Sequence, residues 1–513
     1  MSFQDYFFLD LQTTGAKPDN SNVLEIAWGD DSSTKSFLIA QPEGTKVPYR
    51  IQAITGITDE DMEEAKPLDE VLSIFAEDQQ AVAIIHFAQF EKPFLKHIFG
   101  EELPFEVICT HEIAKRLMPN LPSRGIKGLA GYFGYNAGDV KRGQSYINAT
   151  RVIWQGLTKM LAEKGITNFT ELRAWLAETP KEKRTKYEYP LPKEKRLSLP
   201  DQPGIYRMIS QWGEVLYVGK ATSLKSRVNS YFRGQKNRDP RKLEMLTQTW
   251  DLVVTPCNSP LESALLETDE IKRLNPRYNI SLKTGNRALV FFNRDFTSIS
   301  FAQDKEHTLG PFSSAMAFDS MLKLAESLQQ NDFNTLMFYE EMDPELLKEG
   351  FKIFCERHDF EPYIFSSMRS ILAVGLWWYR KQQEEEILED TEEEILEEEE
   401  NEEIPLTAED VADKFERHFI RAGATYNRVR RLTTLLNSDI DFQLAKSKTS
   451  YRLIIRGGQI KSEAEPNRDP ASHSWQGLAT DHYIATYDRM SVLQSELDKI
   501  KAQNGTVHIH KVH

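Results

Sequence analysis

Tyr217, Lys220, Arg227 and Tyr231 surround a glycine within the stretch GEVLYVGKATSLKSRVNSYF, residues 213–232. Phenol, ammonium and guanidinium groups can exchange protons and bind an anion when a fold brings them together. The same residue types also occur on the solvated edge of a sheet. The elements that carry these residues decide between the two interpretations.

The pattern around Tyr206 and Tyr217 predicts a β-hairpin. The apolar runs PGIYRMIS and EVLYVGK flank Gln211–Gly213, which can form the turn. In a hairpin with a two-residue loop, the numbers of facing residues always sum to an odd value, and side chains alternate with a period of two. The two phenols are therefore expected on the same face of the sheet. Gly219 lies where a larger side chain would obstruct a close approach.

A helix is expected directly after the hairpin. Thr222 or Ser223 can cap its N-terminus, and the helix then begins at Leu224. Arg227 and Tyr231 are four residues apart, so their side chains project together from one face.

The sequence from Ser259 predicts a second helix. Ser259 can cap it, Pro260 suits its first position, Glu262 completes a capping box, and Pro276 limits its far end. Glu267 falls inside the apolar stripe of this helix, which is formed by Ala264, Ile271 and Leu274. An unpaired buried carboxylate is costly, so Glu267 should meet a cation, either a lysine or arginine or a metal ion.

Five blocks in this order, PGIY, LYVGK, SLKSRVNSYF, LLETDEIKRLNPRYN and GPFSSA, resemble the N-terminal GIY-YIG nuclease domain of UvrC, the incision subunit of bacterial nucleotide excision repair. The resemblance covers about residues 201–325 and implies that Tyr217 is the general base that activates water. It also implies roles for six further residues: Tyr206 and Tyr231 orient water and phosphate, Lys220 lowers the phenol pKa, Arg227 binds the scissile phosphate, Glu267 is the single protein ligand of one Mg²⁺ or Mn²⁺ ion, and Asn279 supports the metal side.

These residue types suit phosphodiester hydrolysis. Attack on the phosphorus builds charge on the equatorial oxygens and on the leaving group, which a guanidinium and a hard cation stabilise. A phenol has a pKa of about 10 and becomes a useful base only when nearby positive charge lowers that value. The alternative interpretation is structural: the tyrosines pack on the sheet, and Glu267 forms an ordinary ion pair.

The N-terminal segments FLDLQTTG, ITGIT, HFAQFEKPFL and INATRVIWQGL resemble the DnaQ-like 3′-5′ exonucleases of the DEDD class. That family holds two metal ions with four carboxylates. Asp10 matches the first position, but Gln12 stands at the second, Glu91 replaces an Asp at the third, and Asn148 stands at the fourth. The family's catalytic histidine falls on Gly143. Because two of four anionic ligands are lost, we expect an inactive or nearly inactive exonuclease domain that can still hold a DNA end or a partner.

The chain of 513 residues is too long for one core, and its patterns predict an α/β multidomain protein. An RNase-H-like exonuclease-type domain is followed by a small GIY-YIG α/β domain and a C-terminal α+β region. The expected boundaries are 1–162 for the exonuclease-type domain, 163–200 for a helical and basic linker, 201–285 for the GIY-YIG domain, 286–380 for a UvrC-like accessory region, 381–404 for an acidic linker and 405–513 for the C-terminal domain.

Charge is distributed unevenly along the chain. The formal net charge is -15, and residues 384–403 alone contain 14 acidic and no basic residues. We interpret this run as a solvated linker, with a nucleic-acid mimic that shields a basic face as the alternative. The run from Lys181 to Arg196 holds 7 basic and 3 acidic residues, and its only aromatic residues are Tyr187 and Tyr189. It is either a solvated linker or an arm that contacts phosphates.

Three scattered cysteines, Cys109, Cys257 and Cys355, predict free thiols in a reducing cytosol. His508, His510 and His513 lie near the C-terminus, where a polar strand is favoured over a metal site. RGGQI (456–460) predicts a hairpin turn, because no GK[ST] follows it. The longest apolar run, ILAVGLWWY, is far below the roughly 20 residues that span a bilayer. We therefore expect a cytoplasmic protein without membrane contact.

The sequence as a whole predicts a DNA endonuclease that makes a single-strand incision in a repair setting. The order of domains also resembles bacterial fusion proteins of this plan and Cho, the single-incision relative of UvrC. Neither a UvrB-binding hairpin motif nor a helix-hairpin-helix module is recognisable, so recruitment by a UvrB-like factor stays open. The competing hypothesis is a non-catalytic scaffold that binds DNA ends through two inactive nuclease-like domains.

Overall fold

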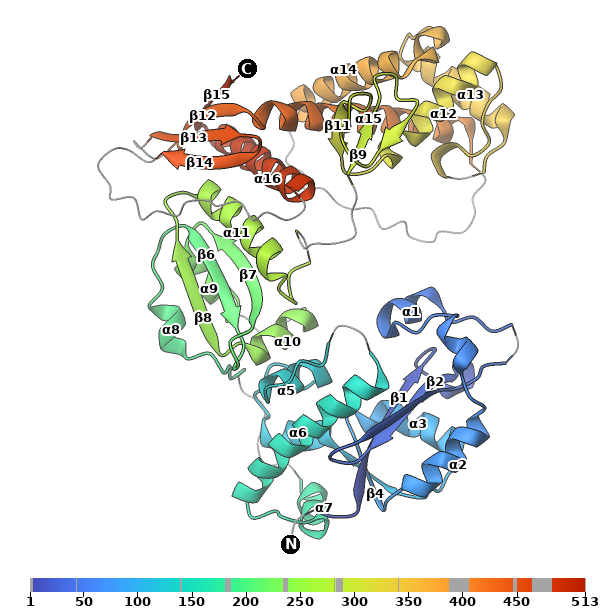
Figure 1. Ribbon diagram of the computed structural model, residues 1–513, viewed down its shortest axis with the longest axis vertical. Coiled ribbons are helices and arrows are strands. Elements are labelled where there is room, and N and C mark those ends of the chain that lie inside the picture. Colours follow the sequence, from blue (N-terminus) through green and yellow to red (C-terminus); the bar gives the residue numbers. More distant parts are fainter. Residues whose placement is uncertain are drawn as a thin grey trace. The chain divides into compact units, whose positions relative to one another are not determined.

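A computed structural model of the chain describes residues 3–42, 44–138, 141–179, 186–233, 239–280, 282, 289–339, 341–386, 406–445, 450–463 and 482–512 (Figure 1). The chain divides into two compact units. The first comprises Met1–Ser263 and Pro276–Ser281, and the second comprises Ala264–Asn275 and Leu282–His513. Each unit is described separately.

The first unit begins with a five-stranded sheet of order β3-β2-β1-β4-β5, which confirms the predicted α/β domain. Its strands are β1 (Tyr6–Thr13), β2 (Val23–Gly29), β3 (Thr34–Leu38), β4 (Val82–Ile85) and β5 (Glu106–Cys109). Strands β1, β2 and β3 are antiparallel, whereas β1, β4 and β5 are parallel. The helices are η1 (Pro18–Asn20), α1 (Tyr49–Thr55), η2 (Asp61–Glu64), α2 (Leu68–Asp78), α3 (Ala88–Phe99), α4 (Thr110–Leu117), α5 (Ile126–Tyr132), α6 (Gly143–Glu163) and α7 (Phe169–Ala177).

Alternation along β1 gives this sheet two buried faces. Phe7 and Leu9 join a core with residues of α2, whereas Phe8 joins a second core with residues of α6. Asp10 and Gln12 share the parity of Phe8, so they lie on the α6 side of the sheet. The fold thus directs both polar residues of the FLDLQ segment toward one helix.

The rest of the first unit contains a three-stranded antiparallel sheet of order β7-β6-β8. Its elements are α8 (Lys193–Leu197), β6 (Gly204–Ile209), β7 (Val215–Ala221), α9 (Leu224–Ser230), α10 (Pro240–Gln248), β8 (Asp251–Pro256) and the start of α11 (Pro260–Leu274). Both predicted N-caps are present. The Ser223 hydroxyl accepts a hydrogen bond from the Ser226 amide, and the Ser259 hydroxyl accepts one from the Glu262 amide, each at 3.1 Å.

The β6–β7 hairpin places the tyrosines as predicted but turns differently. Its loop has three residues, Gln211–Gly213, closed by a 2.9 Å bond from the Ser210 amide to the Glu214 carbonyl. Gly213 has φ +89°, as expected in a three-residue loop. A bulge next to Met208 shifts the register by one, so Tyr206 still faces Gly219 and Met208 faces Tyr217. The two-residue loop was wrong, and the shared face of the two phenols is confirmed because the bulge compensates for the extra loop residue.

The second unit contains two further sheets, of order β10-β9-β11 and β14-β13-β12-β15. Its elements are β9 (Val290–Phe292), β10 (Ile299–Ser300), β11 (Leu309–Phe312), α12 (Met316–Gln330), η3 (Met337–Tyr339), α13 (Pro344–Arg357), η4 (Pro362–Ser366), α14 (Met368–Glu386), α15 (Ala408–Leu435), β12 (Ser438–Gln443), β13 (Ser450–Arg456), β14 (Gln459–Glu463), α16 (His482–Ala502) and β15 (Thr506–Lys511). One core runs from Val290 to Val429 and includes Phe415 and Phe419 of α15.

Packing refines the domain boundaries that we propose. Phe169 and Leu172 of α7 belong to the core of the exonuclease-like domain. Tyr189 packs on Phe232 with ring centroids 4.8 Å apart, and Arg196 donates a 2.6 Å hydrogen bond to Asn229. The described parts of the expected linker at 163–200 are therefore continuous with the domains on either side. Likewise, the first half of α15 completes the core that the accessory region begins.

Two smaller expectations, the hairpin turn and the free thiols, are met. Gly457 and Gly458, both with positive φ, join β13 to β14 in a tight hairpin. Cys109, Cys257 and Cys355 are free thiols. The described helices include none that is long and apolar enough to cross a membrane. Residues 387–403 of the acidic run and residues 181–185 of the basic run lie outside the described residues.

The C-terminal histidines lie on an exposed strand. His508 and His510 are on β15, and the imidazole of His510 lies 3.3 Å from the Asp441 carboxylate. His513 lies outside the described residues. Across the described parts of the chain, no three or more His, Cys, Asp or Glu side chains form a group that could hold a metal ion.

Candidate active site

Three tyrosines form a triangular cluster in the first unit. Tyr206 of β6, Tyr217 of β7 and Tyr231 at the end of α9 have ring centroids 6.0–6.3 Å apart. The hydroxyls of Tyr206 and Tyr231 are hydrogen-bonded at 2.9 Å. Tyr206 is fully buried, whereas Tyr217 and Tyr231 are partly exposed. The structure therefore brings together three phenols from a stretch of the chain in which the first and the last are 25 residues apart.

Gly219 is required by the close approach of two of these rings. A Cβ atom at position 219 would lie 2.4 Å from the hydroxyl oxygen of Tyr206 and 2.7 Å from Cε1 of Tyr217. Tyr206 is fully buried, so its ring could not give way without disturbing the cluster. The predicted close approach at this glycine is thus made by the tyrosines of the chain itself.

Arg227 completes the cluster. Its guanidinium lies 5.3 Å from the centre of the Tyr231 ring, as the spacing of four residues predicted. Burial raises the pKa of Tyr206 well above its usual value; the neighbouring phenols of Tyr231 and Tyr217 add to this, and Arg227 opposes it. Burial lowers the pKa of Arg227, but the phenols outweigh this effect, so its net pKa is raised. The cluster therefore contains one permanently protonated phenol beside one permanent cation.

Asn279 acts on the strand that carries Tyr217. Its side-chain oxygen accepts a 3.0 Å hydrogen bond from the Val218 amide, and its side-chain nitrogen donates a 2.9 Å hydrogen bond to the Val218 carbonyl. Strand β7 is at the edge of its sheet, so these two bonds satisfy backbone groups that no strand pairs. Asn279 thus positions the residues on either side of Val218, which are Tyr217 and Gly219.

The two remaining expected site residues are Lys220 and Glu267. Lys220 faces Ile205, one step beyond the Tyr206–Gly219 pair. Strand alternation consequently directs Lys220 to the face opposite Tyr217. Glu267 lies in the part of α11 that belongs to the second compact unit. Their proposed roles in lowering the phenol pKa and in binding a metal stay predictions.

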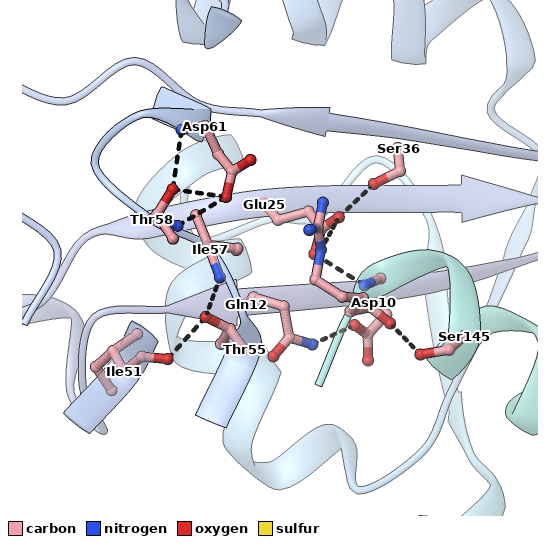
Figure 2. A network of polar contacts seen from close by, with 12 residues as sticks. Asp10, Gln12, Glu25, Ser36, Ile51, Thr55, Ile57, Thr58, Asp61 and Ser145 are labelled. Carbon is pink, nitrogen blue, oxygen red and sulfur yellow. Dashed lines mark hydrogen bonds and ion pairs between the residues drawn. The ribbon is translucent and has the colours of Figure 1, made fainter. Parts of the chain in front are cut away.

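The exonuclease-like domain has a different set of polar residues at the end of β1 (Figure 2). The Gln12 amide donates a 2.6 Å hydrogen bond to the Asp10 carboxylate, and both side chains are buried. Burial raises the pKa of Asp10 well above its usual value, the Gln12 bond opposes this, and Glu25 adds to it. Burial, followed by the Asp10 and Cys109 charges, likewise raises the pKa of Glu91.

Glu25 is a member of this set that the sequence analysis missed. It faces Gln12 across β1 and β2, and its carboxylate accepts bonds from the Gly143 amide at 2.8 Å and the Ser36 hydroxyl at 2.7 Å. Arg142 lies 3.3 Å from the same carboxylate. A charged residue inside the apolar run VLEIAW was the available signal. Figure 2 shows Glu25 between Ser36 and Asp10.

The positions of the lost exonuclease residues are filled by other contacts. A Cβ atom at Gly143 would lie 2.4 Å from Cβ of Ala27, so α6 packs too closely on β2 to accept a histidine there. Asn148 accepts a hydrogen bond from Arg151, which also donates to the carbonyl of Asp30. Two buried carboxylates of this set, Asp10 and Glu25, thus already accept hydrogen bonds from the Gln12 side chain and the Gly143 amide.

Comparison with known proteins finds relatives of the GIY-YIG region and of a longer part of the chain. A family model described as the UvrC-like GIY-YIG domain matches residues 202–280. A putative bifunctional exonuclease/endonuclease protein of Mycobacterium tuberculosis is 28% identical over 337 residues, which are 61% of this chain and 51% of that protein. UvrABC system protein C of Nitrosomonas eutropha is 39% identical over 138 residues, which are 26% of this chain and 23% of that protein.

Among solved structures, exonuclease X in complex with a 5′ overhanging duplex DNA is 20% identical, with 31% of this chain and 93% of that chain covered and a TM-score of 0.25. The chain spans about half the length of the first curated relative and under a quarter of the second. Residues 202–280 therefore form a UvrC-like GIY-YIG domain, and 61% of the chain is similar to a putative bifunctional exonuclease/endonuclease protein.

Proposed function

We propose that this chain is a metal-dependent DNA endonuclease that makes a single-strand incision through its GIY-YIG domain. The observation that carries the proposal is the cluster of Tyr206, Tyr217 and Tyr231 with Arg227. A solvated sheet edge would not bury one phenol completely and bond it to another. The match of residues 202–280 to the UvrC-like domain supports the same reaction class.

The three phenols differ in what they can do. Burial keeps Tyr206 protonated, so it can donate a hydrogen bond and orient its neighbours but cannot accept the proton of water. Tyr217 is partly exposed and is held by Asn279 through the adjacent backbone, which favours it as the base. In the proposed step Tyr217 acts as a phenolate: a water oxygen bonds to phosphorus, a proton of that water passes to the Tyr217 oxygen, the bond from phosphorus to the 3′ oxygen breaks, and solvent water supplies the proton that the departing 3′ oxygen takes up. The products carry a 5′-phosphate and a 3′-hydroxyl.

Arg227 is placed to hold the phosphate. It is exposed, it stays cationic, and its five donors suit the equatorial oxygens on which negative charge accumulates. Glu267 is the proposed ligand of one Mg²⁺ or Mn²⁺ ion, because such ions are commonly held by one carboxylate together with waters and substrate phosphate. The ion would stabilise the developing charge on the leaving oxygen.

We further propose that the exonuclease-like domain is catalytically inactive and that the protein acts in DNA repair. The buried Asp10–Gln12 bond and the close packing at Gly143 support the first point. The similarity to UvrABC system protein C supports the second. Whether a UvrB-like factor recruits the protein is a separate question that pull-down with purified components would answer. The second candidate, a scaffold with two inactive nuclease-like domains, is disfavoured by the intact phenol–arginine cluster.

The test is nicking of labelled duplex DNA, plain and carrying a bulky adduct, in Mg²⁺ or Mn²⁺. Wild type is compared with Arg227→Ala, Glu267→Ala and the matched surface variant Lys225→Ala, which removes an exposed cation from the same helix as Arg227. We expect nicking to be lost in the first two variants and kept in the third. Tight DNA binding without cleavage of either substrate by wild type would favour the scaffold. Retained nicking in Arg227→Ala would place the chemistry elsewhere.

A further inference from the structure

The second unit contains a cationic pocket that the proposed nuclease reaction does not use. It has a volume of about 310 Å³ and lies between α14, α15, α16 and β15. Its charged lining consists of four cationic side chains, Arg380, Arg430, Arg431 and Lys501, and one carboxylate, Asp498. Arg431 is paired with Asp498 at 2.5 Å, so three positive charges are left over.

Those three cations are solvent-exposed and take part in no ion pair within the described parts of the chain. Arg380, Arg430 and Lys501 are all exposed. Three like charges converging on one pocket repel one another, which stabilises nothing in the folded protein. The helix α15 continues this character: five arginines and no carboxylate lie between Arg417 and Leu435. Such a surface suits a polyanion.

An exposed tryptophan lies one helical turn before Arg380, which lines the pocket. Trp377 precedes Arg380 by three residues on α14, so both side chains lie on the same face of that helix. Its side chain is 57% exposed although it is a large apolar group, and Lys381 lies 5.8 Å from its ring. Ile509, which lines the pocket, is also exposed. An aromatic face beside a positively charged groove is the combination with which proteins bind single-stranded nucleic acid, because bases stack on the ring while cations contact the phosphates.

We propose that this pocket, together with Trp377, is a second DNA-binding site that holds a single strand, with Arg380, Arg430 and Lys501 on its phosphates and Trp377 stacked on a base. The inference rests on the proposed function only for the choice of DNA as the nucleic acid. The strand it holds is one that an incision or a lesion has separated from its complement. The site would thus keep the protein on DNA whose strands are already open.

The test measures binding of the full chain to a fluorescent 20-nucleotide oligonucleotide in EDTA, so that no cleavage interferes. The triple variant Arg380→Gln, Arg430→Gln, Lys501→Gln is compared with the control triple Lys348→Gln, Lys352→Gln, Arg369→Gln, which removes the same charge from other exposed positions of the second unit. Loss of three phosphate contacts should reduce the slope of log K against log[salt] by about 2, from roughly 0.7 per contact on a single strand. The control should leave the slope unchanged.

Trp377→Ala should weaken binding of the oligonucleotide roughly 5- to 150-fold, which corresponds to the loss of one stacked base. Binding of a duplex of the same sequence should change little. Equal effects of the two triples, or unchanged binding in Trp377→Ala, would overturn the proposal. The outcome is independent of the nuclease test, because a chain that fails to nick can still show this pocket-dependent binding, and a chain that nicks can lack it.

Discussion

The exonuclease-like domain and the GIY-YIG domain meet in the first unit at α5 and α10, and Gly131 tests whether this contact matters for nicking. A Cβ atom at position 131 would lie 1.9 Å from Oε1 and 2.1 Å from Cδ of Gln248. Gln248 is fully buried. Its nitrogen donates a 2.6 Å hydrogen bond to the Tyr278 hydroxyl, and its oxygen accepts one from Arg277 at 2.8 Å.

We therefore expect Gly131→Ala to displace Gln248 and to loosen Tyr278. Overpacking costs about 1–3 kcal/mol, and weakening the two hydrogen bonds adds about 1 kcal/mol each. Better helix propensity returns about 1 kcal/mol. The free energy of unfolding should fall by about 2–4 kcal/mol. Tyr278 is the neighbour of Asn279 and bonds to the Leu216 carbonyl at 3.0 Å, so the disturbance should reach the strand of Tyr217 and slow nicking several-fold.

The assay combines thermal unfolding with nicking measured well below the midpoint of the transition. Gly143→Ala is the matched control, because its Cβ would lie 2.4 Å from Cβ of Ala27 in the same domain but away from α10. This control should lose stability without loss of nicking. If Gly131→Ala unfolds like wild type, or if both variants nick equally slowly, the reasoning about this contact is refuted.

Three further predictions concern groups whose partners the structure identifies. Asn279→Ala should destabilise the first unit by about 1–3 kcal/mol, because two edge groups of Val218 lose their partners, and Asn279→Asp should restore part of this in thermal unfolding. Arg489→Met removes the 2.8 Å partner, on α16, of Asp269 of α11. Breaking a fully buried ion pair lowers the free energy of unfolding by about 3–5 kcal/mol. The loss measured in denaturant unfolding should be smaller here, because the Asp269 side chain is 23% exposed. Burial already raises the pKa of Asp269, so folding favours its protonated form, and the deficit should shrink as the pH falls through that pKa; a constant deficit would contradict this. Glu91→Gln should stabilise the exonuclease-like domain near neutral pH and lose this effect in acid, because the raised pKa of Glu91 means that its charged form opposes folding.

Local patterns in the sequence predicted the nuclease cluster well. The shared face of Tyr206 and Tyr217 follows from strand alternation, and the contact of Arg227 with Tyr231 follows from helix periodicity. Both caps follow from short polar side chains next to helical runs. The length of the hairpin loop could not be predicted in this way, because the bulge and the third loop residue have opposite effects on the register and leave the same residues facing one another.

Long-range contacts were not accessible in this way. Nothing near Asn279 in the chain indicates that both of its side-chain groups bind Val218, 61 residues earlier. Gly131 is one glycine among 26 until Gln248 lies against it. The acidic run likewise suggested a domain boundary by its composition, whereas the core joins Phe354 of α13 to Phe415 and Phe419 of α15 across it.

The two nuclease-like regions differ in what their residues now do. In the exonuclease-like domain, Gln12 donates to Asp10, the Gly143 amide binds Glu25, and α6 packs where a catalytic side chain would stand. The first two contacts are hydrogen bonds to buried carboxylates, so these residues contribute to the fold of the domain. Its surface at α5 instead contacts α10, whose Gln248 bonds to Tyr278 beside Asn279. We propose that this contact gives the domain a role that needs no exonuclease chemistry, because Tyr278 is next to Asn279, and Asn279 binds the strand that carries Tyr217.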